Sequence, residues 1–361
     1  MLKLNFSKPL IKITFFFLLN INLFLLVSLG NLTLTSCSTT EPPDIKPPVE
    51  PDSTTQNFTF ETFEFGDGFS SSYFNDVFIF DQNNIWVCGN VLTNDSTDGN
   101  LYHWNGHYWN ALRLNYVDME GIWGINGIIY LASNGLWRYN GLALIRQNIT
   151  GTFSQGQGVH KLWGSSENNI WGVGPNGTIV HFDGTAWSKI DFDEGFRFDA
   201  ITGSKQTGIA YASATSQQFN TIIVELKNGA VNIIYDTTID ENHLTSFSIG
   251  LFNEETLILG NKNVWTFNIL SKETEIKYVF PINGDFITLL AIYKPNDIYF
   301  FADKYGNGEI MLHYNGKRFS GFNFSNRNSV IYGGAYAIKD LAVMTGFSNN
   351  KAYLIKVKRV M

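Results

Sequence analysis

The side chains best suited to chemistry in this sequence are six histidines and two cysteines. Three of the histidines, His103, His181 and His313, stand directly before the aromatic residue of a recurring turn. Zinc ligands must all reach one ion at about 2 Å, whereas equivalent positions of a repeat protein lie far apart. These histidines therefore predict packing within separate repeats, and we expect no metal site and no cofactor.

The two cysteines lie in different settings. Cys88 stands among apolar residues, so we expect it to be buried as a small hydrophobic side chain and not to act as a nucleophile. Cys37 follows three lysines, an apolar stretch over residues 13–29 and the small residue Ser36. That order is typical of an export signal, and Ser36-Cys37 resembles the bacterial lipobox, in which the cysteine sulfur receives diacylglycerol.

A transmembrane anchor is the alternative interpretation of the apolar stretch. Asn20 and Asn22 interrupt that stretch, and amides buried without partners in hydrocarbon are costly. We therefore predict a lipoprotein signal peptide over residues 1–36 and a lipid attached to Cys37. The protein would lie in the bacterial cell envelope, held on the outer membrane or cell surface by its N-terminal lipid.

Composition divides the rest of the chain into a tether and one folded domain. Residues 37–56 are rich in Pro, Ser and Thr, which favours an extended tether, and residues 57–361 are predicted to fold. A hydrophobic content of 44% excludes a disordered chain, and a count of two cysteines excludes a disulfide-stabilised one. Without the three leader lysines the formal charge of −7 becomes −10, so nucleic acid is not an expected partner.

Two short patterns recur along the folded part of the chain. In the first, an acidic or amide turn precedes an apolar strand, and its seven copies are anchored by Ile85, Ile129, Ile170, Ile209, Leu257, Ile298 and Leu341. The anchors are about 43 residues apart on average, which is the length of one four-stranded propeller blade. The sequence therefore predicts an all-β fold, a β-propeller of seven four-stranded blades.

The second pattern is an aromatic residue followed by a tight turn, as in Trp104-Asn105-Gly106 and Phe182-Asp183-Gly184. Asn-Gly and Asp-Gly pairs suit the two-residue turn of a hairpin, so each copy marks a strand, a turn and a strand. The seventh repeat stops after its third strand, whereas residues 57–66 alternate apolar and polar residues ahead of the first blade. We expect this N-terminal strand to complete the last blade and close the ring.

The third repeat carries the fullest copy of both patterns. Residues 162–174 read LWGSSENNIWGVG and residues 177–187 read GTIVHFDGTAW. In these motifs the chain resembles a family of bacterial β-propeller lipoproteins and secreted proteins, whose repeats read roughly Trp-Gly-Ser, Asn-Asp-Ile-Trp-x-Val-Gly and His-Tyr-Asp-Gly-x-x-Trp. The resemblance implies a propeller outside the cytoplasm and carries over no catalytic residue.

Loop lengths indicate which face of the propeller binds a partner. The first-to-second and third-to-fourth strand turns are short and share one face, whereas the opposite face receives longer connections, over residues 91–100, 148–159, 191–197, 213–220, 236–243, 303–308 and 322–329. Irregular loops on a rigid face usually hold the binding groups. The candidate binding residues are Asp95, Asp98, Gln155, Phe192, Arg197, Phe219, Tyr305 and Arg327.

Together these features predict a monomeric, lipid-anchored β-propeller that acts outside the cytoplasm as a non-enzymatic scaffold. Its ligand would be a protein or glycan of the cell envelope, and a periplasmic assembly factor for outer-membrane proteins would share the same fold. The alternative is a glycan-active hydrolase or lyase with its site at the mouth of the central channel. That alternative needs two inward carboxylates at catalytic spacing, and the sequence shows no catalytic motif.

Overall fold

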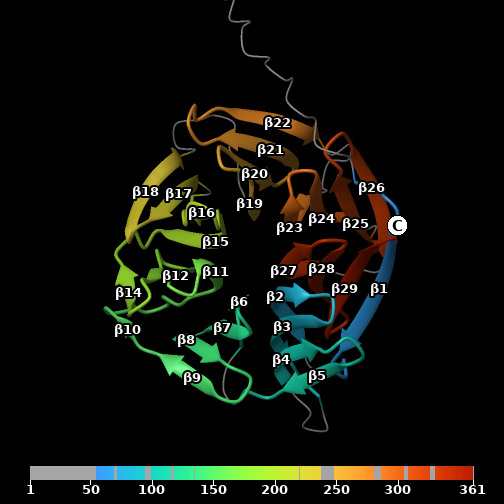
Figure 1. Ribbon diagram of the computed structural model, residues 1–361, viewed down its shortest axis with the longest axis horizontal. Coiled ribbons are helices and arrows are strands. Elements are labelled where there is room, and N and C mark those ends of the chain that lie inside the picture. Colours follow the sequence, from blue (N-terminus) through green and yellow to red (C-terminus); the bar gives the residue numbers. More distant parts are fainter. Residues whose placement is uncertain are drawn as a thin grey trace, which may run out of the picture. The chain divides into compact units, whose positions relative to one another are not determined.

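The computed structural model describes residues 54–68, 71–93, 99–114, 118–133, 135–218, 220–236, 248–279, 286–304, 308–325 and 330–360. Within these ranges the regular elements are β-strands, which form seven sheets arranged as blades around a central channel (Figure 1). The prediction of a seven-bladed all-β propeller is therefore confirmed. The predicted signal peptide, Cys37 and residues 38–53 of the tether lie outside the described residues.

Blades 1 to 6 follow one another along the chain. Blade 1 contains β2 (Tyr73–Asp81), β3 (Asn84–Val91), β4 (Gly99–Trp104) and β5 (Trp109–Leu112), and blade 2 contains β6 (Gly121–Ile125), β7 (Ile128–Ser133), β8 (Gly135–Tyr139) and β9 (Leu144–Gln147). Blade 3 contains β11 (Lys161–Ser166), β12 (Asn169–Val173), β13 (Ile179–Phe182) and β14 (Trp187–Ile190), and blade 4 contains β15 (Phe196–Gly203), β16 (Ala210–Ser216), β17 (Thr221–Lys227) and β18 (Ala230–Asp236). Blade 5 contains β19 (Ser248–Asn253), β20 (Thr256–Gly260), β21 (Asn263–Asn268) and β22 (Thr274–Val279), and blade 6 contains β23 (Phe286–Lys294), β24 (Asp297–Lys304), β25 (Gly308–Tyr314) and β26 (Phe319–Ser325).

Blade 3 departs from the expected four strands. The short strand β10 (Ile149–Thr150), from the connection between blades 2 and 3, pairs in parallel with β14 and adds a fifth strand at the outer edge. The sequence patterns did not predict this strand, because its two residues are too few to show a period.

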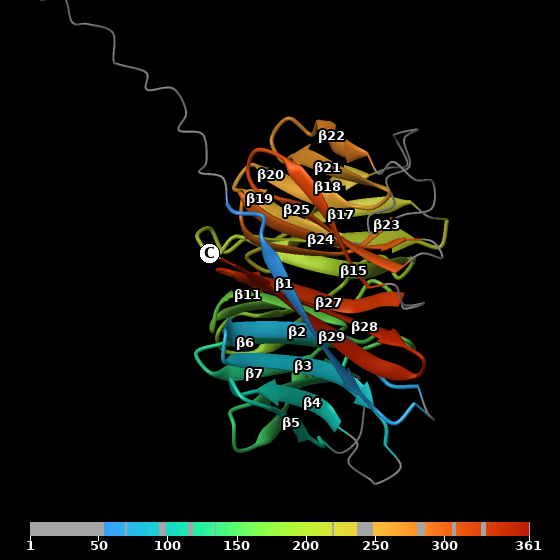
Figure 2. The ribbon, with the colours of Figure 1, turned by 90° about the vertical axis from the view of Figure 1, so that its right-hand side faces the viewer.

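The seventh blade contains β27 (Val330–Ile338), β28 (Leu341–Ser348) and β29 (Lys351–Arg359), and the N-terminal strand β1 (Phe58–Phe65) completes it. β1 pairs antiparallel with β29 from Phe58 opposite Arg359 to Phe65 opposite Ala352. Figure 2 shows β1 crossing the outside of this blade. The predicted closure of the ring is confirmed.

The apolar residues of β1 contact two different neighbours. Phe58 and Phe60 pack with a hydrophobic cluster that includes residues of blade 6, whereas Phe63 and Phe65 pack with a cluster that includes residues of blade 1. Because successive side chains of a strand point to opposite faces, the change from even to odd positions moves the aromatic rings from one face to the other. One strand thus seals the two interfaces on either side of the last blade.

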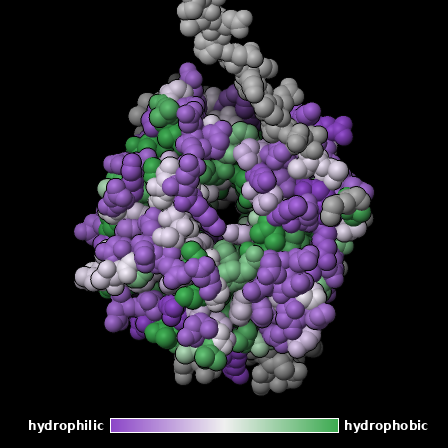
Figure 3. Space-filling view, viewed as in Figure 1, coloured by the Kyte–Doolittle hydropathy of each residue, from purple (hydrophilic) through white to green (hydrophobic). Residues whose placement is uncertain are grey.

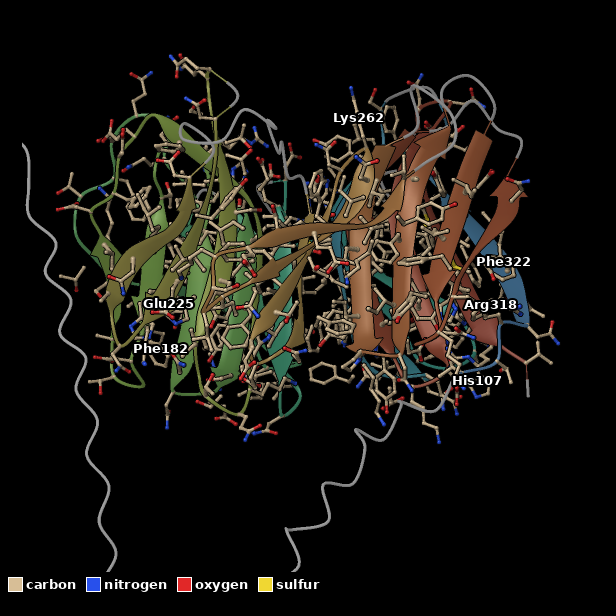
Figure 4. All side chains as sticks on the ribbon, turned by 90° about the horizontal axis from the view of Figure 1, so that it is seen from above. His107, Phe182, Glu225, Lys262, Arg318 and Phe322 are labelled. Atoms are coloured by element: carbon tan, nitrogen blue, oxygen red, sulfur yellow. The ribbon has the colours of Figure 1, made fainter. Side chains whose placement is uncertain are left out.

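The tight turns lie together on one face of the propeller. The turn between β6 and β7 has positive φ at both central residues, 48° at Asn126 and 77° at Gly127, as a two-residue hairpin requires. Figure 4 shows His107 and Arg318, which belong to third-to-fourth strand turns, on one face, and Lys262, which lies between β20 and β21, on the other. The first-to-second and third-to-fourth strand turns thus share one face, as predicted, but the opposite face also has a short connection, the two residues between β20 and β21.

Glycines on the inner strands let the blades approach each other closely. A Cβ atom on Gly164 would lie 2.7 Å from the ring of Trp123 in the preceding blade, and one on Gly203 would lie 2.7 Å from the ring of Trp163. Any larger residue at these positions would displace a tryptophan. The repeated Trp-Gly pair thus interlocks one inner strand with the next.

A buried polar cluster ties the chain ends together between blades 6 and 7. Asp297 accepts a 2.9 Å hydrogen bond from His313 Nε2 and a second, short one from Arg359 Nη2. Arg359, near the C-terminus, also donates to Asp340 Oδ1 at 2.9 Å. Although burial favours the neutral acid, the hydrogen bonds from His313 and Arg359 hold the pKa of Asp297 below its usual range. We call these four residues the closure cluster.

The first described residues rest on the short-turn face, next to the closure cluster. Thr54 donates its backbone N–H to Asn315 O at 3.3 Å and its hydroxyl to Asn296 O at 3.0 Å. Gln56 Nε2 lies 3.2 Å from His313 Nδ1. The chain therefore joins the propeller at the short turns of blade 6, on the face opposite the long loops.

Candidate functional site

The central channel is the candidate site. The innermost strands of all seven blades surround a cavity of about 900 Å³. Figure 3 shows the ring hollowed at its centre. Each innermost strand begins at the long-loop face and ends at the short-turn face, so the start of each strand marks the long-loop mouth of the channel.

A lysine crosses the channel at this mouth. Lys161, at the start of β11 in blade 3, donates to Asn75 O of blade 1 at 3.0 Å and to Gly333 O of blade 7 at 3.4 Å. Its ammonium group also lies 3.5 Å from Asp76 Oδ2, and Asp76 accepts hydrogen bonds from the backbone N–H groups of Val77 and Ile122. Burial raises the pKa of the Asp76 carboxyl, and Lys161 opposes that shift. This pair links blades 1, 2, 3 and 7 across the channel.

Arginine and aspartate form a second pair on β15 in blade 4. Arg197 Nε donates to Asp199 Oδ1 at 2.8 Å, and the arginine side chain remains 58% exposed. Burial raises the pKa of Asp199, against the effect of Arg197. Within the described residues, no partner is found for the two Nη groups of Arg197, so they are available to a ligand.

Glu120 and His160 complete the mouth from blades 2 and 3. Burial raises the pKa of Glu120, and no hydrogen-bond partner of its carboxylate is found in the described part of the chain. Burial, together with Arg197 and Lys161, lowers the pKa of His160 to about 4, so this imidazole is neutral at pH 7. The mouth thus offers a carboxylate, an imidazole and a guanidinium, and the guanidinium interacts electrostatically with the other two groups.

Most of the charge lies on one side of the channel and at its long-loop mouth, and Lys205, just after the end of β15, adds one charge at the other end. Blades 1 to 4 supply all six of the charged and histidine side chains just described, whereas blades 5 to 7 line the same level with Ser248, Thr288, Gly333 and Gly334. Deeper in the channel the wall becomes apolar, with Trp123, Trp163, Leu290 and Tyr336. A ligand that enters from the long-loop face meets polar groups first and apolar groups further in.

Of the eight predicted binding residues, three lie among the described residues and only Arg197 lines the channel. Gln155 is exposed on the connection before β11, where its carbonyl oxygen accepts a hydrogen bond from Asn176. Phe192 is half-buried and packs against Phe196 and Phe198. The other five lie outside the described residues: Asp95, Asp98, Phe219, Tyr305 and Arg327.

The predicted bounds of several connections were wrong, because strands extend into them: Ser213–Ser216 belong to β16, Asp303–Lys304 to β24 and Phe322–Ser325 to β26. Arg197 belongs to β15, where it pairs with Thr215, and not to a connection over 191–197. The aromatic and charged residues at its start continue the sheet because their backbone groups complete the ladder with β16. Its position in a strand fixes its side chain at the channel mouth more firmly than a loop would.

Sequence reasoning missed five residues of the mouth: Asp76, Glu120, His160, Lys161 and Asp199. Glu120, His160 and Lys161 lie at or just before the start of an innermost strand, whereas Asp76 and Asp199 are the fourth residues of β2 and β15. The usable signal was therefore a charged or histidine residue near the beginning of an innermost strand in blades 1 to 4. Two β-bulges, between Phe74 and Asp76 and between Phe198 and Ala200, shift the strand alternation beside these residues. Bulges often re-aim side chains at functional sites.

The three repeat histidines have structural partners. His103 Nε2 lies 3.0 Å from Asn84 Oδ1, and His181 Nε2 lies 2.8 Å from Asn169 Oδ1. Burial lowers the pKa of all three histidines, including His313 in the closure cluster. Each has a partner in its own blade, as predicted, and His313 also contacts Gln56 of the N-terminal segment and Arg359 of blade 7. In the described residues, no group of three His, Cys, Asp or Glu side chains is arranged to hold a metal ion.

Cys88 is a free, fully buried thiol. Burial raises its pKa well above the usual range, so the reactive thiolate is disfavoured. This agrees with the predicted packing role.

Comparison with known proteins shows the fold. No family model and no curated protein matches this chain in sequence. Among solved structures, YCF48 bound to a D1 peptide has a TM-score of 0.62 and 13% identity, covering 84% of this chain and 96% of that chain. A catalytically inactive virginiamycin B lyase from Staphylococcus aureus, with quinupristin, has a TM-score of 0.62 and 11% identity, covering 84% of this chain and 100% of the other.

The WD40 propeller domain of Doa1 is similar as well, with a TM-score of 0.58 and 9% identity, covering 83% of this chain and 96% of the other. The chain is thus a seven-bladed β-propeller with a charged channel mouth. A fold shared by a peptide complex, a lyase and a WD40 domain is compatible with binding and with catalysis. Among the described residues, no helix has the length and apolar character needed to span a membrane.

Proposed function

We propose that this protein is a lipid-anchored propeller of the bacterial cell envelope that acts as a non-enzymatic binding scaffold. Its binding site is the long-loop mouth of the channel. The observation that carries this proposal is the group of side chains at that mouth, where Arg197, Glu120 and His160 have hydrogen-bonding groups that the described residues leave without partners. The first described residues of the N-terminal segment contact the opposite face, so they leave the charged mouth open.

The partner that suits this mouth best is a polypeptide segment of an envelope protein. Peptides offer cationic and anionic groups together with N–H and C=O groups, which match a carboxylate and a guanidinium set side by side. The apolar wall below can receive an apolar side chain of the same segment. The peptide complex of YCF48, which shares the fold, supports this choice.

Photo-crosslinking in cells tests the location of the site. A crosslinking amino acid at Gln155, exposed on the connection before β11, should capture a discrete partner, whereas one at His107 on the short-turn face should not. Arg197→Glu should reduce the Gln155 adduct about tenfold or more, because it removes a charge-assisted hydrogen bond and adds a like charge beside Asp199.

Lys227→Glu is the matched control, since Lys227 is exposed on the short-turn face of the same blade. It should leave the adduct unchanged. If Lys227→Glu abolished the adduct and Arg197→Glu kept it, the partner would bind the short-turn face, and the proposed location of the site would be wrong.

The anchor is tested by Cys37→Ser. This change removes the sulfur that would receive the lipid, so incorporation of labelled fatty acid should fall to background and the protein should leave the membrane fraction or remain unprocessed. The measurement is fatty-acid labelling followed by membrane fractionation. Undiminished labelling of the variant would refute the proposed attachment site.

A glycan-active hydrolase or lyase is the second candidate, and one observation favours it. The raised pKa of Glu120 is the property that a general acid needs, and Asp199 lies on the same channel wall. Cleavage of an envelope polysaccharide by the purified protein, lost in Glu120→Gln, would establish this candidate in place of the scaffold.

A further inference from the structure

In blades 1, 3 and 6 one position of the repeat holds a pair of rings, stacked in blades 1 and 3 and tilted in blade 6, whereas blade 7 has Ala342 opposite Val357 there. Trp86 stacks on His103 in blade 1 with ring centroids 4.1 Å apart, and Trp171 stacks on His181 in blade 3 at 3.9 Å. In blade 6 the rings of Tyr299 and His313 lie 4.8 Å apart. The two rings of each pair stand opposite each other on the second and third strands.

Blade 5 keeps this register and lacks the rings. Ile258 of β20 stands opposite Thr266 of β21, at the place where Trp171 stands opposite His181. Together these two side chains are smaller than a tryptophan and a histidine. A cavity of about 910 Å³ lies beside these two residues, lined by residues of blades 5 and 6.

The cavity has an apolar floor and polar sides. Phe252 and Ile258 of blade 5 and the tilted ring pair Tyr314 and Phe319 of blade 6, 4.7 Å apart, supply the apolar part. The polar part comes from three threonines, Asn268 and the charged residues of β22 and the turn before it.

Several of these polar groups are available to a ligand. Asn268 Oδ1 accepts from the backbone N–H groups of Leu270 and Ser271, which leaves its amide Nδ2 as a free donor among the described residues. The hydroxyl groups of Thr256 and Thr274 likewise have no partner within the described ranges. Glu275 and Lys277 lie at the rim and pair with each other.

We propose that this inter-blade cavity is a saccharide-binding site. A pyranose ring has a C–H face that packs on aromatic rings and a rim of hydroxyl groups that donate and accept hydrogen bonds, which matches a floor of Tyr314 and Phe319 beside free hydroxyl and amide groups. An aromatic side chain of a partner protein would fill the same space but would bury those polar groups without partners, which is costly. The volume falls within the usual range of small-ligand sites. This site is separate from the channel mouth and does not depend on the function proposed there.

The test uses the full-length protein and a panel of tetrasaccharides. Chitotetraose, maltotetraose and tetragalacturonic acid should be titrated against it by calorimetry, and at least one should bind with a dissociation constant in the millimolar range or below. Ile258→Trp/Thr266→His introduces the ring pair of blade 3 and partly fills the cavity, so it should lower the affinity at least about tenfold. Asn268→Ala/Thr274→Ala, which removes rim groups and leaves the core intact, should lower it about fivefold or more.

Two controls separate this site from the rest of the molecule. Lys262→Ala, on the opposite face of blade 5, and Arg197→Glu, at the channel mouth, should both keep the saccharide affinity. Failure of all three saccharides to bind at millimolar concentration would overturn the proposal, as would affinity that survives in both cavity variants. Binding of N-acetyl-tryptophanamide in the cavity in place of any saccharide would also overturn it. If the filled variant does not fold, the rim variant decides.

Discussion

Deletion of residues 57–66 should abolish the cooperative unfolding of the propeller, although it removes none of the visible repeats. The deletion removes all of β1, the strand that pairs along β29 and covers the interfaces of blade 7 with blades 6 and 1. Four half-buried phenylalanines leave with it, and their lost burial is on the order of 6 kcal/mol, comparable with the whole stability of many domains. We expect a broad melting transition and aggregation through the exposed edge of β29, measured by circular dichroism and light scattering.

Two triple variants of β1 test whether its buried rings, and not its exposed side chains, hold the ring closed. Phe60→Ala/Phe63→Ala/Phe65→Ala removes rings that face the two neighbouring blades and should destabilise the protein nearly as much as the deletion. Thr59→Ala/Thr62→Ala/Glu64→Ala changes exposed positions of the same strand and should lower the melting temperature by only a few degrees. Equal melting of the deletion variant and the intact protein would show that β1 does not close the ring.

Arg359→Ala should destabilise the protein by about 3–5 kcal/mol, because it leaves the buried carboxylate of Asp297 without its cationic partner. Asp297 is 1% exposed, and Arg359 is the only arginine that the described residues place beside it. The loss can be measured by urea-induced unfolding of the full-length protein. The effect should be large for a single residue near the C-terminus, because the closure cluster joins the last strand to blade 6 and lies next to Gln56 of the N-terminal segment.

The double variant Asp297→Asn/Arg359→Met is the matched control. It removes both charges together, so it should be markedly more stable than Arg359→Ala alone. Arg318→Ala, which changes an exposed arginine near the same N-terminal segment, should change stability by less than about 1 kcal/mol. If Arg318→Ala were as damaging as Arg359→Ala, the stability would come from the N-terminal contacts and not from the buried charge pair.

The blade count and the ring closure could be predicted because local signals repeat. Asn126-Gly127 and Asp183-Gly184 mark hairpins wherever they occur, and a spacing of about 43 residues leaves room for four strands and their turns. The third strand of the last repeat lacked a partner, and so did the strand predicted over residues 57–66. These two strands were therefore expected to pair with each other. The two-residue strand β10 carried no such signal.

The channel mouth could not be predicted in the same way. Asp76 and Lys161 are 85 positions apart in the sequence and meet only because the innermost strands of blades 1 and 3 converge on one axis. The bulges in β2 and β15 also reset the alternation of side chains, so the residues that line the channel cannot be assigned from the strand period alone. Of the charged and histidine residues at the channel mouth, the argument from loop length predicted Arg197 alone.

The sequence by itself determined the number of blades, the position of the short turns and the strand that closes the ring, because these follow from the periodicity and turn chemistry of neighbouring residues. Only the tertiary structure decided which charged residues meet in the channel, which residues hold the chain ends together, and that a cavity lies beside Ile258 and Thr266 between blades 5 and 6. These depend on contacts between blades, and such contacts are set by the geometry of the closed ring, which brings distant residues together and fixes how much space lies between them.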